Sequence, residues 1–162
     1  MKTLPQAQKL AHVRRLPQLL DVSIPEGFFR NLMMNWDQVR EMQKGGIEFG
    51  AHTMNHPILT RISVEQARDE VIVSKARIEA ELGEPVLGFA YPNGQSSDVN
   101  GQIEQIVAGS GIRAAFTLLN GPSSQSEVRR NPYAIRRIFI SHRHSLAEYA
   151  MLLSPINRYR SN

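Results

Sequence analysis

Apolar residues recur at helical spacing most clearly between residues 63 and 83. The repeated positions there are Val64, Ala67, Val71, Ile78 and Leu82. Ser63 and Gln66 have the form of a capping box, and Gly83 is a residue that readily ends a helix. The pattern therefore predicts an amphipathic helix over this stretch.

Four other segments carry helix start and stop signals. Helices are expected over residues 3–15 and 35–44, around residues 103–107 with an end at 109–111, and over residues 145–153. Pro17 is expected to interrupt or restart the first of them, because proline lacks the N–H that a helix interior requires. Asn35 and Gln38 form the capping pair of the second, which stops at Gly45.

Short apolar runs alternate with these helices. Strands are expected over residues 47–51, 86–91, 113–119 and 137–140, with a polar loop at 120–132 before the last of them. Strands that alternate with helices in this way are typical of βαβ units and a mainly parallel sheet. The polar sequences HTMNH (52–56) and YPNG (91–94) directly follow two of the strands, where the active sites of such folds collect.

Length and composition are those of a single globular domain. The chain has 162 residues, of which 41% are apolar and 21% are charged. No run of about 18 apolar residues occurs, so no membrane span is expected, and the sequence begins without the apolar core of a signal peptide. The absence of cysteine excludes a disulfide scaffold, a thiol nucleophile and a cysteine-ligated metal, and it leaves the compartment open.

Positive charge is concentrated late in the sequence. The net charge is +4, and residues 127–162 hold seven arginines against two glutamates. Such arginines can line a solvated face, pair with carboxylates or bind an anionic polymer. The candidates for the last role are Arg129, Arg130, Arg136 and Arg137. No basic and aromatic alternation marks a nucleic-acid groove, so no nucleic-acid partner is expected.

His52 and His56 form the sharpest chemical feature of the sequence. Neutral imidazole is a good ligand for zinc and related ions, and two histidines on one short loop bring two ligands together at little entropic cost. The pattern differs from the helical H-E-x-x-H of metalloproteases, because Thr53 stands in place of the glutamate. Taken alone, the pair is more typical of ordinary loop or packing histidines than of a metal site, and two histidines do not complete a catalytic zinc site.

The stretch WDQVREMQKGGIEFGAHTMNHPILTRIS, followed by GFAYPNG, resembles the polysaccharide deacetylase family, also called the NodB-homology group or carbohydrate esterase family 4. The resemblance runs from about Trp36 to Phe139. It implies a partial or distorted (β/α) barrel that lacks its first strands. It also implies that His52 and His56 are two metal ligands, with Thr53 at the family's small hydroxyl position.

The family's Pro-aromatic-Gly turn corresponds to residues 92–94 of this chain. Asn93 replaces the aromatic residue, whose backbone amide in the family helps to bind the oxyanion, so Asn93 is a catalytic candidate. Tyr91 and Pro92 are substrate-binding candidates in the wall of the groove. Without the neighbouring histidine motif, the same sequence would be read as a simple turn.

The family's Asp-Asp motif, which supplies the general base and a third metal ligand, has no counterpart here. No two aspartates are adjacent in the sequence, and Asp21, Asp37 and Asp98 stand in other contexts. Residues 1–34 are interpreted as a variable helical segment, and residues 35–162 as an incomplete deacetylase-like domain. The chain is accordingly expected to lack the family's first strands, and an exposed sheet edge is expected to favour association.

A late histidine serves the family as general acid, because its pKa lies near neutrality. His142 is the candidate here, with His144 close by, and a surface or structural role is the alternative.

The resemblance implies hydrolysis of N-acetyl, or less often O-acetyl, groups on a polysaccharide or oligosaccharide. The expected cofactor is a divalent metal, with zinc as the expected ion. We expect little or no activity from this chain alone, because the aspartate base is missing. The alternatives are a non-catalytic carbohydrate-binding pseudoenzyme and, from another class, an anionic-polymer binder.

Overall fold

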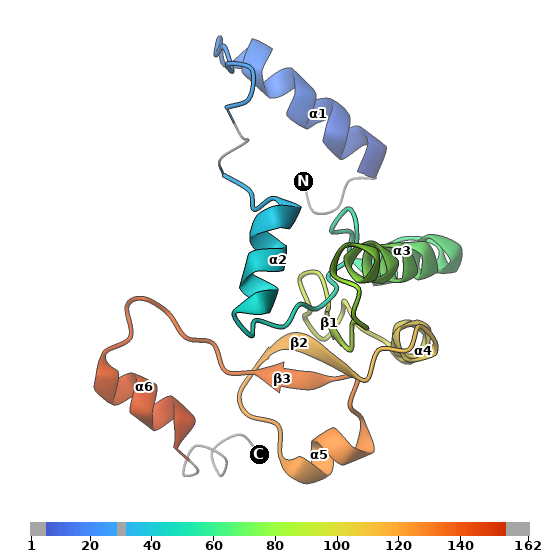
Figure 1. Ribbon diagram of the computed structural model, residues 1–162, viewed down its shortest axis with the longest axis vertical. Helices are drawn as coiled ribbons and strands as arrows, with labels where there is room; N and C mark the ends of the chain where they lie inside the picture. The colour runs from blue at the N-terminus through green and yellow to red at the C-terminus, as the bar shows by residue number, and fades with distance from the viewer. Residues whose placement is uncertain (1–5, 29–31, 155–162) are drawn as a thin grey trace. The chain divides into compact units, whose positions relative to one another are not determined.

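The computed structural model describes residues 6–28 and 32–154 (Figure 1). The chain divides into two compact units, Met1–Gly45 and Gly46–Asn162, which we describe separately. The assignment of residues 1–34 and 35–162 as two functional segments stays a prediction. None of the helices in the described part of the chain is long and apolar enough to cross a membrane.

The first unit holds α1 (Gln6–Leu19) and α2 (Trp36–Lys44). The expected break at Pro17 is wrong, because α1 runs through it to Leu19. Pro17 lies near the end of α1, so its missing N–H removes a single late hydrogen bond, and its carbonyl still accepts from the N–H of Val22 at 2.9 Å. Thr3, the predicted start, lies outside the described residues.

The predicted start of α2 is confirmed. The Asn35 side chain accepts from the backbone N–H of Gln38 at 2.9 Å, and the Gln38 side chain accepts from the N–H of Asn35 at 3.0 Å. This reciprocal pair satisfies two backbone donors that the first turn would otherwise leave without partners.

The second unit is built on a parallel sheet with the strand order β1-β2-β3, which confirms the predicted α/β class. The strands are β1 (Gly88–Ala90), β2 (Ala114–Asn120) and β3 (Ile135–Arg137). The helices of this unit are η1 (Leu59–Arg61), α3 (Val64–Leu82), α4 (Gly101–Gly109), α5 (Gln125–Arg130) and α6 (Leu146–Leu153).

The predicted strand at 47–51 is reduced to a single parallel bridge between Ala51 and Phe89. The N–H of Ala51 donates to Gly88 at 2.9 Å, and Ala51 in turn accepts from the N–H of Ala90 at 2.9 Å. The approach is close at Gly50, where a Cβ would lie 3.0 Å from the Gly88 oxygen. Contact with β1 at this one residue still places the HTMNH sequence beside the end of β1.

Two further predictions about the end of this unit are corrected. The loop expected at 120–132 contains α5, which a Ser124–Glu127 capping box starts. Hydrogen bonds from the Ser124 backbone and side chain lower the pKa of the Glu127 carboxyl. The last strand ends at Arg137 rather than beginning there, because the N–H of Phe139 donates to the Asn120 side chain at 3.1 Å instead of to a strand partner.

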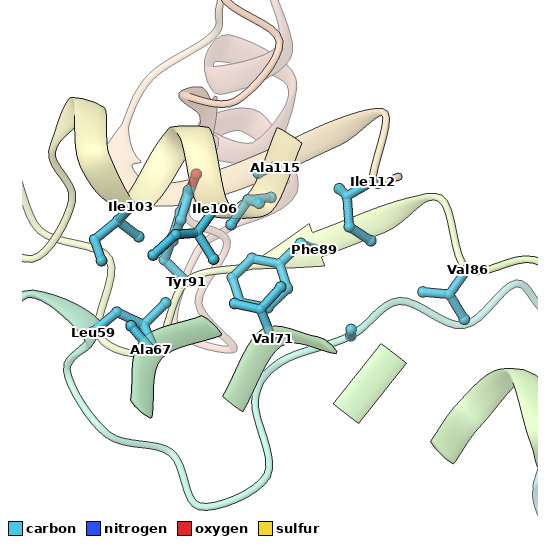
Figure 2. Packing of buried hydrophobic residues seen from close by; sticks show 12 residues of the cluster. Leu59, Ala67, Val71, Val86, Phe89, Tyr91, Ile103, Ile106, Ile112 and Ala115 are labelled. Atoms are coloured by element: carbon cyan, nitrogen blue, oxygen red, sulfur yellow. The ribbon is translucent and has the colours of Figure 1, made fainter. Parts of the chain in front are cut away.

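The core of the second unit lies where β1 meets α3 and α4 (Figure 2). Its buried members are Ala51, Leu59, Ala67, Val71, Val86, Phe89, Tyr91, Ile103, Ile106, Val107, Ile112 and Ala115. The predicted apolar stripes of α3 and α4 both contribute to this cluster. At the far end of α3, Glu79 accepts from Lys75 and from the N–H of Val86, and these bonds lower the pKa of Glu79 while fixing the approach to β1.

Candidate functional site

Two loops meet at the end of β1, and both carry predicted site residues. The HTMNH loop (residues 52–56) follows the bridge residue Ala51, and the YPNG turn (residues 91–94) follows β1. Because Ala51 runs parallel to β1, both segments leave the sheet at the same edge. The Thr60 hydroxyl also donates to the Ser97 carbonyl at 3.1 Å, so the chain beyond the two loops remains adjacent.

A hydrogen bond to the backbone of β1 orients His52. Nδ1 of His52 lies 2.6 Å from the carbonyl oxygen of Ala90. A carbonyl only accepts, so Nδ1 carries the proton in this contact. In the neutral ring the lone pair is then on Nε2, which is the arrangement found in many metal-binding histidines.

The two histidines of the loop are neighbours. Their ring centroids lie 4.9 Å apart with an interplanar angle of 76°, and both side chains are exposed. Two imidazoles on one tetrahedral zinc ion, with Zn–N bonds of about 2 Å, place their ring centres about 5 Å apart. The separation of the two rings is therefore that of two ligands of a single ion, and their role as ligands stays a prediction.

The loop that carries the two histidines has a strained backbone. Thr53 has φ 68° and His56 has φ 54°, in the left-handed region that non-glycine residues rarely adopt. The Thr53 hydroxyl accepts from the N–H of His56 at 3.1 Å and closes the loop internally. Such conformations persist where surrounding contacts hold them.

Glu70 of α3 holds the middle of the loop. One carboxylate oxygen accepts from the N–H of Met54 at 2.7 Å and from the N–H of Asn55 at 2.9 Å. The other accepts from Nδ2 of Asn55 at 2.7 Å. We call this set of three hydrogen bonds the Glu70 clamp.

The YPNG turn is fixed against β2. The N–H of Tyr91 donates to Phe116 at 3.1 Å, and the Gly94 carbonyl accepts from the N–H of Leu118 at 2.7 Å. The turn residue Asn93 has φ 64°. Its Nδ2 donates to Asp98 at 2.7 Å, so its side chain faces Asp98 while its backbone supplies the turn.

The side chains of Tyr91 and Pro92 are buried, Tyr91 with an exposed fraction of 1%. The Tyr91 hydroxyl donates to the Tyr133 carbonyl at 2.9 Å, and burial raises the pKa of Tyr91. This position does not favour direct contact between these two side chains and a sugar. Their role in substrate binding stays a prediction, in which they act by shaping the turn and not by touching the substrate.

Of the aspartates singled out in the sequence, Asp98 is held by the YPNG turn and the residues that follow it. Asp98 is 2% exposed and accepts from Asn93, from the N–H of Gln95 and from Ser97. Asp37 pairs with Arg40 at 2.6 Å on α2. Over residues 6–28 and 32–154, no group of three or more histidine, aspartate or glutamate side chains is arranged to hold a metal ion.

The late histidines lie beyond β3. The His142 side chain is exposed. Nδ1 of His144 accepts from the N–H of Ser141 at 3.2 Å, and its ring lies 6.4 Å from that of Phe139, so His144 closes a local turn. Within the described ranges, neither residue makes a hydrogen bond or ring contact with His52 or His56, and the acid role of His142 stays a prediction.

Two of the late arginines already have protein partners. Arg136 lies 3.6 Å from Glu127, and Nε of Arg137 donates to the Thr117 carbonyl at 2.6 Å. The Arg136 contact matches the carboxylate-pairing interpretation, whereas Arg137 is held by a backbone carbonyl.

Sequence reasoning missed Glu70, and it named Asp98 without finding that Asp98 organises the YPNG turn. Glu70 lies on the predicted helix at a position that helical periodicity treats as ordinary, and Asp98 follows a turn. The signal for Asp98 was local, since it accepts the N–H of Gln95 three residues before it. No local signal marks Glu70, because the backbone N–H groups that donate to it belong to Asn55 and Met54, which lie 15 and 16 residues earlier in the sequence.

Comparisons with known proteins agree on one family. A family model described as polysaccharide deacetylase matches residues 21–115, which is more than half of the chain. A search of curated proteins gave no match.

Solved structures share the fold. The Streptococcus pyogenes deacetylase PplD, determined with acetate, is 26% identical with a TM-score of 0.69, and the match covers 75% of this chain and 51% of that one. A polysaccharide deacetylase from Bacillus cereus is 22% identical with a TM-score of 0.67, covering 75% and 37%. A de-N-acetylase from Aggregatibacter actinomycetemcomitans is 19% identical with a TM-score of 0.62, covering 80% and 58%.

This chain thus spans between about a third and three-fifths of the length of these structures. The range matched by the family model, residues 21–115, includes the HTMNH loop and the YPNG turn. The chain belongs to the polysaccharide deacetylase family.

Proposed function

We propose that this chain carries the metal-binding part of a carbohydrate deacetylase that removes N-acetyl or O-acetyl groups from a polysaccharide or oligosaccharide. The observation that carries the proposal is the pairing of His52 and His56, with His52 held by the Ala90 carbonyl. Deacetylases of this family are hydrolases that in general depend on a metal.

The donor set suits a divalent ion of the zinc type, because both candidate ligands are imidazoles and the chain has no cysteine. His52 and His56 would hold the ion. When bound, such an ion acidifies water and polarises the acetyl carbonyl. The hydrogen bond from His52 to Ala90 would keep the imidazole in the tautomer that offers Nε2.

The YPNG turn would contribute through its backbone. The Asn93 side chain is tied to Asp98, so the group that the turn can offer an oxyanion is the N–H of the peptide. The buried side chains of Tyr91 and Pro92 would support the conformation of this turn. His142 would act as general acid and protonate the leaving group.

The proposed activity of this chain alone is weak or absent. Abstraction of the proton from water needs a base beside the ion, and the sequence contains no adjacent aspartates to supply the family's base and third ligand.

Titration with zinc is the direct test of the proposed ligands. We expect the folded chain to bind one zinc ion per molecule. His52→Ala and His56→Ala should each lower the affinity by more than the ~10–100-fold that loss of an outer partner of a ligand costs, because each removes a donor atom. Calorimetry measures stoichiometry and affinity together.

His12→Ala is the matched control, since it removes an exposed histidine from α1 in the other unit. It should leave zinc affinity unchanged. Equal binding by wild type, His52→Ala and His56→Ala, with all three folded, would show that the proposed ligands are wrong.

A non-catalytic carbohydrate-binding protein is the second candidate. It is favoured by the absence of a third metal ligand near His52 and His56 within the described part of the chain. For the deacetylase proposal, we expect acetylated chitooligosaccharide to bind in a manner that chelator and His52→Ala both abolish. We also expect acetate release at the level of the blank. Binding that survives both treatments would favour the pseudoenzyme, and metal-dependent release of acetate lost in His56→Ala would show that the chain suffices for catalysis.

A further inference from the structure

We propose that Glu70 is the positioning residue of the HTMNH loop, fixing His52 and His56 in the arrangement that one ion requires. The expected effect of Glu70 on metal affinity rests on the proposed function, whereas its effect on the conformation of the loop can be measured without metal. The role belongs to the hydrogen bonds of the carboxylate, not to its charge.

The clamp uses both oxygens of Glu70 and reaches the loop between the two histidines. Its donors are the N–H groups of Met54 and Asn55 and the Nδ2 group of Asn55. A single side chain thereby fixes two successive peptide groups and one side chain of the loop.

The loop needs such a restraint because of its backbone. Thr53 and His56, on either side of the clamped residues, both have positive φ, and such strained conformations persist only where the surroundings hold them. Without the clamp, relaxation of Thr53 to an ordinary conformation would rotate the chain between the two imidazoles.

Packing does not replace the hydrogen bonds here. A hollow of about 320 Å³ lies beside the loop and is lined by Met54, Asn55, Gln66, Asp69, Glu70 and Val73. Met54 is 51% exposed and Val73 is 48% exposed, so apolar contacts on this side are weak. Glu70 itself is anchored well, because Ala67 and Val71 beside it on α3 are fully buried.

Substitutions of Glu70 and Asn55 distinguish an effect of hydrogen bonding from an effect of charge. Glu70→Ala removes the acceptors. Glu70→Gln keeps one acceptor oxygen, and its amide can donate to Oδ1 of Asn55 once that side chain turns over. Asn55→Asp places two carboxylates face to face, and the double variant Asn55→Asp with Glu70→Gln restores a donor–acceptor pair with the roles reversed.

We expect Glu70→Ala and Asn55→Asp to lower zinc affinity by ~10–100-fold, as loss of a partner that orients ligands does. Glu70→Gln and the double variant should recover most of that loss. Without metal, amide hydrogen exchange at Met54 and Asn55 should be about tenfold faster in Glu70→Ala, and the nuclear Overhauser contact between the two imidazoles should weaken. Circular dichroism confirms that each variant is folded.

Asp69→Ala is the matched control, because Asp69 lines the same hollow and carries the same charge but takes no part in the clamp. It should leave zinc affinity and both amide exchange rates unchanged. If Asp69→Ala and Glu70→Ala weaken zinc binding equally, Glu70 acts through charge and the proposal is overturned.

The exchange measurement separates this proposal from the proposed function. If wild type binds no zinc but Glu70→Ala accelerates exchange and separates the imidazoles, the metal proposal fails and the positioning role stands. If wild type binds zinc and Glu70→Ala changes neither affinity, exchange nor the imidazole contact, the positioning role fails and the metal proposal stands.

Discussion

Gly94→Ala is expected to destabilise the chain by about 3–5 kcal/mol, as the sum of backbone strain, overpacking and a lost hydrogen bond. Gly94 has φ +62°, and a Cβ there would lie 2.7 Å from the backbone nitrogen of Leu118. That nitrogen donates to the Gly94 carbonyl at 2.7 Å, so the turn cannot move away without losing the bond. Urea denaturation followed by circular dichroism measures the free energy of unfolding.

Gly83→Ala separates backbone strain from the other two contributions. Gly83 ends α3 with φ +70°, and a Cβ there would meet nothing within 4 Å. This substitution should cost only about 1–2 kcal/mol, the cost of the left-handed conformation. Equal losses for the two variants would mean that the YPNG turn is not held closely against β2.

Helix starts were predictable from the sequence because capping is local. The boxes at Asn35, Ser63 and Ser145 all formed as expected. The same signal is present at Ser124 and Glu127, but α5 has only six residues and shows no helical periodicity, so the sequence alone favours a loop there. Pro17 was misread for a related reason, since a proline near a helix end removes little hydrogen bonding.

Strand bounds were harder to predict because they depend on the partner. Apolar residues at 47–51 predicted a strand, but pairing with β1 reaches only Ala51. At the other edge, the side chains of Thr117 and Asn120 interact with the last strand and the residues after it, so the ladder stops at Arg137. Such pairings join residues far apart in sequence, where no short pattern reports them.

In the candidate site, too, local features could be predicted from the sequence and long-range contacts could not. His52 and His56 could be found from one short sequence, and their rings lie 4.9 Å apart in the structure, while their role as metal ligands stays a prediction. The Glu70 clamp could not be predicted, because nothing in the helical pattern of α3 distinguishes Glu70 from its neighbours. The burial of Tyr91 was also hidden, since the turn sequence does not say which face of the sheet its side chains meet.

Phe89→Ala is expected to cost about 3–5 kcal/mol, the usual loss for a buried aromatic residue cut back to alanine. Phe89 is 1% exposed in the middle of β1 and belongs to the cluster shared with α3 and α4 (Figure 2). Its ring lies 5.3 Å from that of Tyr91, and its backbone faces Ala51. The substitution therefore loosens both segments that lead into the candidate site.

Leu87→Ala is the matched control on the same segment, because Leu87 is 40% exposed and its backbone carbonyl still accepts from Arg113 and Ala114. It should cost under about 1 kcal/mol, as surface truncations do. Zinc affinity measured at low temperature, where both variants are folded, should fall in Phe89→Ala alone. We expect this result because Ala90, whose carbonyl accepts from His52, directly follows Phe89, so a shift of Phe89 in the core also shifts the group that orients His52. Unchanged affinity in a destabilised Phe89→Ala would mean that the HTMNH loop holds its two histidines without help from β1.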